Sequence, residues 1–428
     1  MFYIIERSDQ LQRLPKFEDC FVRFIPKSNN YHPILTELSL IYIRPLEKNK
    51  GYILCLNHSE SFGLDQTEVF NYLLNNTNRL WVQDKKKALY WFYPLFDKLY
   101  DINFVGNIEE VTTICSDYFY HKHSYLPNIN CLIPISKHYE ESELLFEKIL
   151  PLTINFTPTP QFEFNNSKTV EVFFQIEKQG IKLDKNCFIE YYKENLKNPE
   201  YNIQKGKIYT QYNLYTTTSR PSNTFNNINF AALNKDNGER RCYKPENDMF
   251  IEMDFQGYHP RLIGELVGFP FLNSRNTYET LSTILNVTQQ EAKELTFKQL
   301  YGGVWSEYAL KPFFKDVISY IDGMWDSYQY GKYITTENKI FIYDNSITQT
   351  KLFNYVVQSK ETSTNVQLLK LVLDYLKDKK TKLVLYTYDA FLFDYSKDDE
   401  NILENLSQLL HYPIHIKQGK SYHGLINL

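Results

Sequence analysis

The sequence predicts a fold of the α+β class, and three observations support this prediction. The segments MFIEMDF (249–255) and KLVLYTY (382–388) alternate apolar and polar residues with the period of a β-strand. The second segment continues as DAFLFDY, which predicts a hairpin with Asp389 at or near its turn. Between these segments, residues 288–303 open with a capping box and end in two glycines, as a helix does.

The composition is that of a soluble globular protein. The chain has 428 residues, of which 43% are apolar and 23% charged, and this length favours two or three domains. We expect no membrane span, because no apolar run reaches the length of a bilayer helix. We also expect no signal peptide, because an acidic residue stands within the first ten residues. The six cysteines lack metal-binding spacing, which favours a reducing cytoplasm. A net charge of −4 leaves nucleic-acid binding open, since one cleft can be basic on an acidic protein.

Strand-like and helix-like segments alternate along the chain. The N-terminal block contains a strand-like run at 51–56 and a helix-like run at 138–150. The segment 149–164 holds three of the 17 prolines and little charge, which predicts a connector between domains. After it, residues 169–184 have apolar side chains at helical spacing, with Gly180 as the predicted stop.

Two aspartates and the helix between them carry the candidate chemistry. Asp254 and Asp389 each end a strand-like run, and carboxylates at neighbouring strand ends can bridge two metal ions roughly 3.5–4 Å apart. On the helix, Lys293, Phe297 and Tyr301 recur at four-residue steps and therefore share one face. An ammonium group followed by two rings suits a triphosphate, a sugar and a base.

Each of these features alone also has an ordinary structural explanation. An aspartate at a strand end is often a turn residue. The helix pattern equally fits an amphipathic helix with two core aromatics and a solvated lysine. Taken one at a time, the features leave both interpretations open.

Together, these segments resemble the family A (bacterial polymerase I-like) DNA polymerases. Residues 254–261 resemble the family's first polymerase motif, D-Y-S-Q-I-E-L-R, and residues 293–302 resemble the second, K-x3-F-x3-Y-G. Tyr388, Asp389 and Ala390 stand where the third motif has His-Asp-Glu. The segment TTTSRPSNTFNNINF (216–230) resembles the family's T-x-T-G-R-L-S-S segment. Asn354 and Gln358 match the Asn-x3-Gln pattern that precedes the family's third motif. Five likenesses in the family's order, over about 170 residues, carry the resemblance.

The resemblance implies a right-hand polymerase fold and its activity. A palm with an antiparallel sheet would carry helical fingers (about 265–330) and a truncated thumb, preceded by an RNase H-like α/β domain of the exonuclease type. The implied activity is that of a DNA-directed DNA polymerase, a nucleotidyltransferase that adds dNTPs to the 3′ end of a primer. Two Mg²⁺ ions are the implied cofactors.

The resemblance also assigns roles to particular residues. Asp254, Asp389 and Lys293 would be catalytic, with both aspartates and the backbone carbonyl of Phe255 as metal ligands. The nucleotide would be bound by Lys293, Phe297, Tyr301, His259 and Gln289. Primer-template DNA would be bound by Arg220, Arg261, Asn354, Gln358 and Tyr388. Donors at the minor groove suit this purpose, because every correct base pair presents acceptors there.

Three positions depart from the family's pattern. His259 replaces the first-motif glutamate, which in the family blocks a ribose 2′-hydroxyl and bonds the helix tyrosine, so sugar discrimination is in doubt. Ala390 replaces the third-motif glutamate, and Gln289 replaces an arginine that precedes Lys293 by one turn. Because both aspartates remain, we expect a slower or more selective polymerase.

The predicted domains are an exonuclease-like domain at 1–150, a connector and reduced thumb at 151–219, and the palm and fingers at 220–428. Residues 177–184 resemble the E-x-x-G-I-x-x-D element that precedes the family's thumb, and only residues 185–219 separate them from Arg220. A full thumb needs more length. We therefore expect low intrinsic processivity, or a protein partner that supplies the missing clamp.

The N-terminal block lacks the acids of an active 3′→5′ exonuclease. The strand predicted at 20–29 has no acid where such enzymes carry D-x-E, and residues 82–92 have lysines where a metal-binding acid should stand. Tyr139 and Glu143 resemble the last exonuclease motif, with Glu in place of Asp. Without the first acids, two-metal hydrolysis lacks its ligands, so we expect a scaffold without proofreading.

Two alternative interpretations remain open. A single-subunit RNA polymerase has the same order of motifs, and His259 keeps this option open, whereas Arg261 and the TTTSR segment favour the DNA enzymes. A non-catalytic replication or scaffold protein is suggested by the short thumb, but the retention of both aspartates, Lys293 and Tyr301 argues against it. So compact a chain would suit a phage or other virus, with the host cytoplasm as its location.

Overall fold

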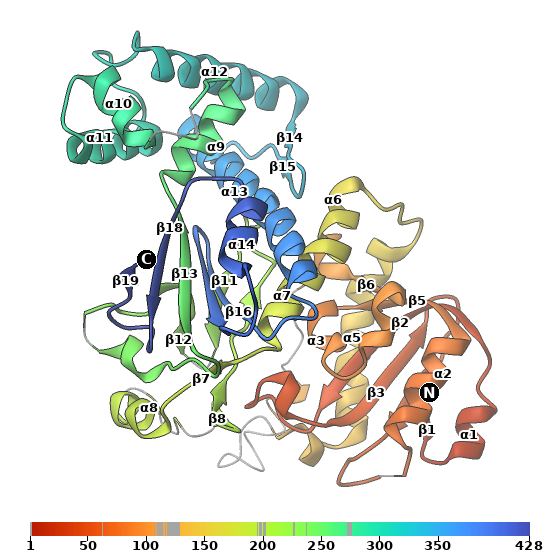
Figure 1. The fold of residues 1–428 in the computed structure, drawn as a ribbon. Coiled ribbons are helices and arrows are strands. Elements are labelled where there is room, and N and C mark those ends of the chain that lie inside the picture. Colours follow the sequence, from red (N-terminus) through yellow and green to blue (C-terminus); the bar gives the residue numbers. More distant parts are fainter. Residues whose placement is uncertain are drawn as a thin grey trace. The chain divides into compact units, whose positions relative to one another are not determined.

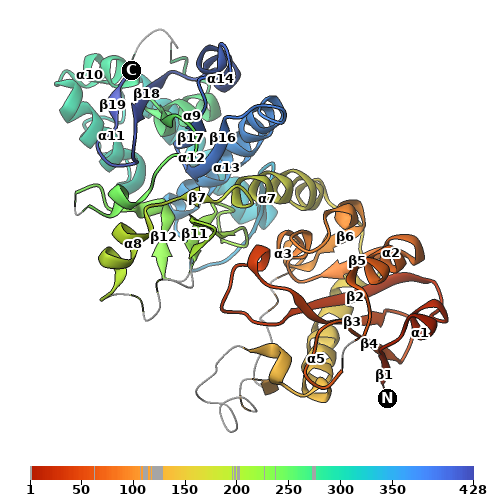
Figure 2. The ribbon, with the colours of Figure 1, turned by 60° about the horizontal axis from the view of Figure 1, so that its bottom comes forward.

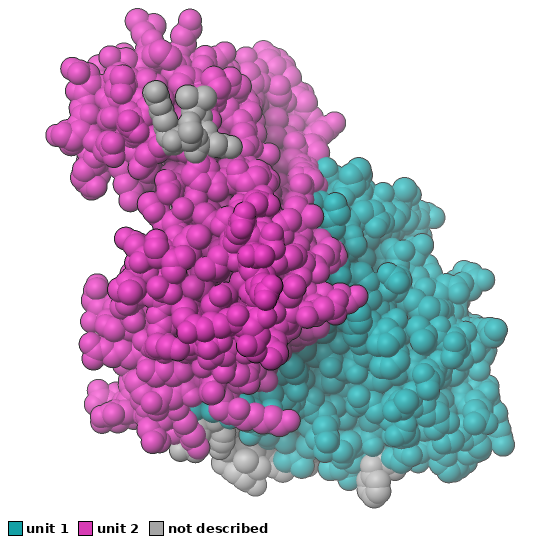
Figure 3. Space-filling model, in the orientation of Figure 1, with its two compact units in different colours: residues 1–174, 200–204 teal, residues 175–199, 205–428 magenta. Residues whose placement is uncertain are grey.

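In a computed structural model, the chain divides into two compact units, which Figure 3 shows in different colours. Unit 1 comprises residues 1–174 and 200–204, and unit 2 comprises residues 175–199 and 205–428. The structure describes residues 2–61, 63–106, 108, 114–115, 117, 129–194, 196, 199, 203–225, 227–236, 238–271 and 276–428. The predicted ranges 1–150, 151–219, 216–230 and 265–330 each include positions that lie outside the described residues.

A six-stranded sheet with the order β1-β4-β3-β2-β5-β6 forms the centre of unit 1 (Figure 2). β2, β3 and β4 are antiparallel neighbours, whereas β5 pairs parallel with β2, β6 with β5, and β1 with β4. The strands are β1 (Phe2–Ile5), β2 (Phe17–Pro26), β3 (Leu38–Pro45), β4 (Gly51–Cys55), β5 (Thr77–Val82) and β6 (Leu99–Asp101). β2 and β4 confirm the strands predicted at 20–29 and 51–56.

Helices pack on both faces of this sheet, and β3 is buried along its whole length. On one face, Phe21 and Ile25 pack with Leu145 of α5 (Ile135–Thr153), the helix predicted at 138–150. On the other face, Phe24 contacts Phe70 of α2 (Gln66–Asn76), with ring centroids 6.1 Å apart. Each fully buried apolar side chain contributes about 1.5–3 kcal/mol. Further helices of unit 1 are α1 (Ser8–Gln12), α3 (Lys85–Leu89) and α6 (Pro160–Glu163).

The proline-rich segment 149–164, predicted to connect domains, lies entirely within unit 1. α5 continues through Pro151 into its last turn, and Pro160 is the first residue of α6, where a backbone N–H has no helical partner to lose. A π-helical segment, Phe164–Thr169, joins α6 to α7 (Val170–Glu177). These prolines thus mark helix termini, and the boundary between the units falls after residue 174 rather than at the predicted residue 150.

α7 confirms the helix predicted within 169–184, and Gly180 follows it as the predicted stop. Gly180 has a φ of +63°, a left-handed conformation that glycine adopts without steric penalty. The chain then forms β7 (Ile181–Lys182), after which the Asp184 carboxylate accepts two backbone hydrogen bonds of 3.1 Å and caps α8 (Lys185–Tyr192).

Unit 2 is built on an antiparallel sheet with the order β16-β17-β13-β18-β19 (Figure 1). The central strand β13 (Met249–Phe255) pairs with β17 (Ala390–Tyr395) on one side and β18 (Ile414–Gly419) on the other. β16 (Lys382–Thr387) and β17 form the predicted hairpin, with Asp389 in its turn. Shorter strands of unit 2 are β9 (Lys207–Ile208), β10 (Tyr212–Asn213), β11 (Ser222–Phe225), β12 (Ile228–Asn229), β14 (Tyr333–Thr335), β15 (Ile340–Ile342) and β19 (Ile426–Asn427), while β8 (Ile203–Gln204) belongs to unit 1.

The helices of unit 2 are α9 (Tyr258–Val267), α10 (Thr277–Leu285), α11 (Gln289–Gly302), α12 (Pro312–Gly331), α13 (Gln349–Tyr375) and α14 (Ile402–Leu410). α10, α11 and α12 gather at one end of the unit, beyond the sheet (Figure 1). A buried apolar cluster that includes Ile263, Leu281, Leu300, Phe313 and Phe353 unites the helices from α9 to α13. Within the described residues, no helix has both the length and the apolar character that crossing a bilayer requires.

α11 begins and ends where the sequence predicts. The Thr288 hydroxyl accepts from the Glu291 N–H at 3.3 Å, and the Glu291 carboxylate accepts from the Thr288 N–H at 2.9 Å. Such a cap stabilises a helix by about 1 kcal/mol. Gly303, with a φ of +95°, then turns the chain away.

Candidate active site

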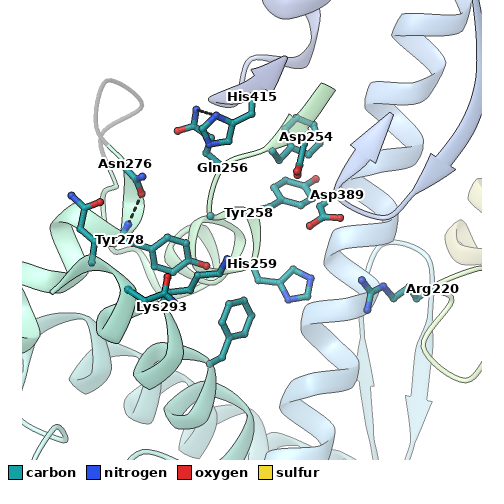
Figure 4. A pocket seen from close by; sticks show the side chains of 15 residues that line it. Arg220, Asp254, Gln256, Tyr258, His259, Asn276, Tyr278, Lys293, Asp389 and His415 are labelled. Carbon is teal, nitrogen blue, oxygen red and sulfur yellow. Dashed lines mark hydrogen bonds between the residues drawn. The ribbon is translucent and has the colours of Figure 1, made fainter. Parts of the chain in front are cut away.

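A pocket of about 590 Å³ in unit 2 opens between β13, the β16–β17 turn, β18, α9 and α11 (Figure 4). Its lining contains Arg220, Asp254, Phe255, His259, Gln289, Lys293, Phe297 and Asp389 from the predicted site. Side chains that lie far apart in the sequence therefore meet at one place.

The ladder between β13 and β17 brings Asp254 and Asp389 together. Asp254 lies opposite Ala390, and the Phe255 N–H donates to the Asp389 carbonyl at 2.9 Å. Both carboxylates face the pocket (Figure 4). Burial raises the pKa of Asp389 above its ordinary value, and the charge of Asp254 raises that pKa further. Burial also raises the pKa of Asp254.

These two acids fit a site for divalent cations. Two neighbouring carboxylates that repel each other are stabilised by a cation between them, and oxygen ligands are those that Mg²⁺ prefers. The ammonium group of Lys417 lies 3.6 Å from Asp254 Oδ2 but also 3.2 Å from Glu252 Oε1, so its single charge is shared. In the described part of the chain, no ion pair reaches Asp389.

The turn that presents Asp389 is held in an unusual conformation. Tyr388 has a φ of +66°, which is sterically unfavourable for a bulky residue and costs on the order of 1–3 kcal/mol. The side-chain amide of Asn365 on α13 donates to the Tyr388 carbonyl at 2.8 Å, and the Tyr258 hydroxyl donates to Asn365 at 2.6 Å. The Arg220 guanidinium lies 3.8 Å from the centroid of the Tyr388 ring. Strain of this kind persists only where neighbouring groups enforce it, and it is typical of functional sites.

α11 presents its predicted face to the pocket. Lys293 and Phe297 line the pocket, with Lys293 exposed to solvent and Phe297 partly buried. The ring of Tyr301 stacks on that of Phe297, with centroids 5.9 Å apart and an interplanar angle of 12°. The Tyr301 hydroxyl contacts Nδ1 of His259 on α9. The helix thus contributes an ammonium group at the mouth and two stacked rings farther along.

Five of the predicted residues are not part of the pocket's lining: Arg261, Tyr301, Asn354, Gln358 and Tyr388. Gln358 accepts a 3.0 Å hydrogen bond from Thr218, close in sequence to Arg220. Arg261 is only 3% exposed and donates to the Gln256 carbonyl at 3.2 Å. Its guanidinium therefore braces the connection between β13 and α9, and its contact with DNA stays a prediction.

Four further ionisable side chains lie in or beside the site but were not predicted from the sequence: Glu252, Glu361, His415 and Lys417. Glu252 lies two residues before Asp254 on the same face of β13, and this spacing could have revealed it. The register of β18 places His415 opposite Asp254 and Lys417 opposite Glu252. No local pattern reports that register.

Comparison with known proteins gives a result at the level of the fold. No protein-family profile matches the sequence, and no curated protein matches it. Among solved structures, the chain has the fold of a DNA polymerase POL domain.

A structure with this fold is the POL domain of Pol1 from M. smegmatis in complex with DNA primer-template and dNTP. The TM-score is 0.63 and the sequence identity 12%, and the match covers 99% of this chain and 99% of that chain. At such low identity the likeness establishes the fold alone.

Proposed function

We propose that this chain is a DNA-directed DNA polymerase of the family A type, which adds dNTPs to a primer 3′ end. One observation carries the proposal: Asp254 and Asp389 meet in a pocket that also holds Lys293, in a chain with the fold of a POL domain. Two carboxylates facing a lysine across a pocket suit phosphoryl transfer, in which catalysis depends on positioning and charge stabilisation.

The acids would hold the cations, and α11 would hold the nucleotide. Asp254, Asp389 and the Phe255 carbonyl would bind two Mg²⁺ ions, which activate the primer hydroxyl and stabilise charge at the α-phosphate. Lys293, with Gln289 one turn earlier, would bind the triphosphate, and Phe297 would pack on the sugar. The primer 3′-oxygen forms the new bond to the α-phosphorus, and the bond to the departing pyrophosphate breaks.

The primer-template duplex would lie against the Arg220 side of the pocket. Arg220 is partly exposed and stacks on Tyr388, beside the turn that carries Asp389. Gln358 and Asn354 are on α13, which also supplies the Asn365 that holds this turn. Donors at these positions would meet the acceptors of the minor groove and check base-pair geometry.

Unit 1 would be an RNase H-like scaffold without proofreading. The sheet order and its mixed directions support such a fold, with three antiparallel strands followed by two parallel ones. The acids nearest its last exonuclease-like motif are paired with arginines: Arg23 lies 2.7 Å from Glu141, and Arg44 lies 3.2 Å from Glu143. With the reduced thumb expected between 185 and 219, we propose low processivity unless a partner protein supplies a clamp.

Primer extension by the purified protein tests the proposal. The reaction contains Mg²⁺, a gapped or primed template and either dNTPs or rNTPs, and runs beside Asp254→Ala and Asp389→Ala. Template-directed extension with dNTPs that both variants abolish supports the proposal. Extension with rNTPs alone points to an RNA polymerase, and no extension at high enzyme concentration points to a non-catalytic role.

A further inference from the structure

A buried carboxylate lies directly behind the wall of the pocket. Glu361, in the middle of α13, has 0% of its surface exposed. One carboxylate oxygen lies 2.9 Å from Nε2 of His259, and the other lies 2.9 Å from Nε of Arg220. A charged group buried inside a protein is strongly unfavourable unless it is paired. Its two partners are both residues of the pocket, which ties Glu361 to the site rather than to the core alone.

The contacts continue from His259 to α11. An ionised carboxylate only accepts hydrogen bonds, so Nε2 of His259 donates to Glu361, and Nδ1 of the same ring is engaged by the Tyr301 hydroxyl. Tyr301 in turn stacks on Phe297. One chain of contacts therefore runs from Arg220 through Glu361 and His259 to Tyr301 and joins four separate segments of unit 2.

This arrangement fixes what His259 presents to a nucleotide. With both ring nitrogens engaged, the imidazole has no free donor or acceptor, so its exposed edge consists of C–H groups. His259 and Phe297 both line the pocket, and their ring centroids lie 6.0 and 5.9 Å from that of Tyr301, so the two rings form one apolar wall. A 2′-hydroxyl placed against such a wall loses its hydrogen bonds to water and gains none in return, whereas a 2′-hydrogen loses nothing.

We propose that Glu361 is the positioning residue that locks His259 into this wall, and thereby makes the pocket select deoxyribonucleotides over ribonucleotides. The proposal rests on the proposed polymerase function, because it assigns the sugar specificity of the same site. The selecting carboxylate acts from α13 through the histidine and does not itself touch the sugar.

The test compares wild type with Glu361→Gln, Glu361→Ala, His259→Ala and the double variant Glu361→Ala/His259→Ala. The measured quantity is the ratio of kcat/KM for a dNTP to that for the matching rNTP in single-nucleotide insertion. We expect both Glu361 variants to lower this ratio on the order of 10-fold, mainly through the KM for the rNTP, because a released imidazole can bond the 2′-hydroxyl. The effects of substituting residues that act as a unit are not additive. The dNTP/rNTP ratio of the double variant should therefore be no lower than that of His259→Ala alone.

A matched control separates specificity from folding. Glu141 is also buried and paired with an arginine, but in unit 1, and Glu141→Gln should leave the dNTP/rNTP ratio unchanged. The proposal is overturned if Glu361→Gln and Glu361→Ala keep the wild-type ratio, if the double variant shows additive losses, or if wild type has no dNTP preference. The same ratio measured as equilibrium Kd values decides the matter even if wild type extends no primer, so the two proposals fail separately.

Discussion

Each unit places acids against a central sheet, but the two sets of acids are treated in opposite ways. In unit 1, Glu141 and Glu143 each have an arginine within 3.2 Å, and the Tyr42 hydroxyl donates to Glu143 at 2.6 Å. In unit 2, Asp254 and Asp389 lie next to each other, and among the described residues the one ion pair that reaches them joins Asp254 to the shared Lys417. Paired acids are compensated in the folded protein itself, whereas we propose that the aspartates take a cation from outside. Acidic side chains therefore have a structural role in one unit and a predicted catalytic role in the other.

The largest expected difference between the two sets is in catalysis. Asp389→Ala and Asp254→Ala should lower primer extension roughly 10³-fold or more, because each removes a ligand of the two-metal site. Glu143→Gln in unit 1 should retain extension within a few-fold. The measurement is the initial rate on a primed template at saturating Mg²⁺. Comparable losses in both units would break the contrast and give unit 1 a part in the chemistry.

For the stability of the fold, we expect the acids of unit 1 to matter most. Glu141→Ala removes the carboxylate that pairs with the largely buried guanidinium of Arg23, and breaking a buried pair in this way costs about 3–5 kcal/mol. Urea unfolding followed by circular dichroism measures this loss, with Lys137→Ala as the control. Lys137 pairs with Glu140 at the exposed surface of the same helix, where a pair contributes about 0–1 kcal/mol.

Replacing Asp389 by Asn should stabilise the metal-free protein. The pKa of Asp389 is raised in the folded state by burial and by Asp254, so ionisation of this carboxyl destabilises the fold at pH values above that pKa. The destabilisation is present at neutral pH and disappears as the pH falls through the raised pKa. Melting temperatures in EDTA should therefore be higher for Asp389→Asn at pH 7–8, and should converge with wild type toward acid pH. A variant less stable than wild type at every pH would contradict this.

The sequence predicts those parts of the site that depend on local signals. The strand period around Asp254, the hairpin turn at Asp389 and the capping box of α11 all depend on residues close together in the chain, and the structure has each of them. Glu361 lies 102 residues from His259, so no local pattern could join them. The prolines in 149–164 predicted a connector but lie at helix termini, because proline is tolerated there as well as in linkers.

The smallest effect tests whether the aspartates need an external cation at all. A ligand that binds only the folded state stabilises it by RT ln(1 + [L]/Kd), so Mg²⁺ at ten times its Kd adds about 1.4 kcal/mol. Wild type should show a rise in melting temperature as Mg²⁺ replaces EDTA, and Asp389→Asn should show almost none. Glu141→Gln should respond as wild type does, because its acid belongs to the internally paired set. A Mg²⁺ response that survives in Asp389→Asn would place the cation elsewhere, and the two unit 2 aspartates would then be no more a metal site than the paired acids of unit 1.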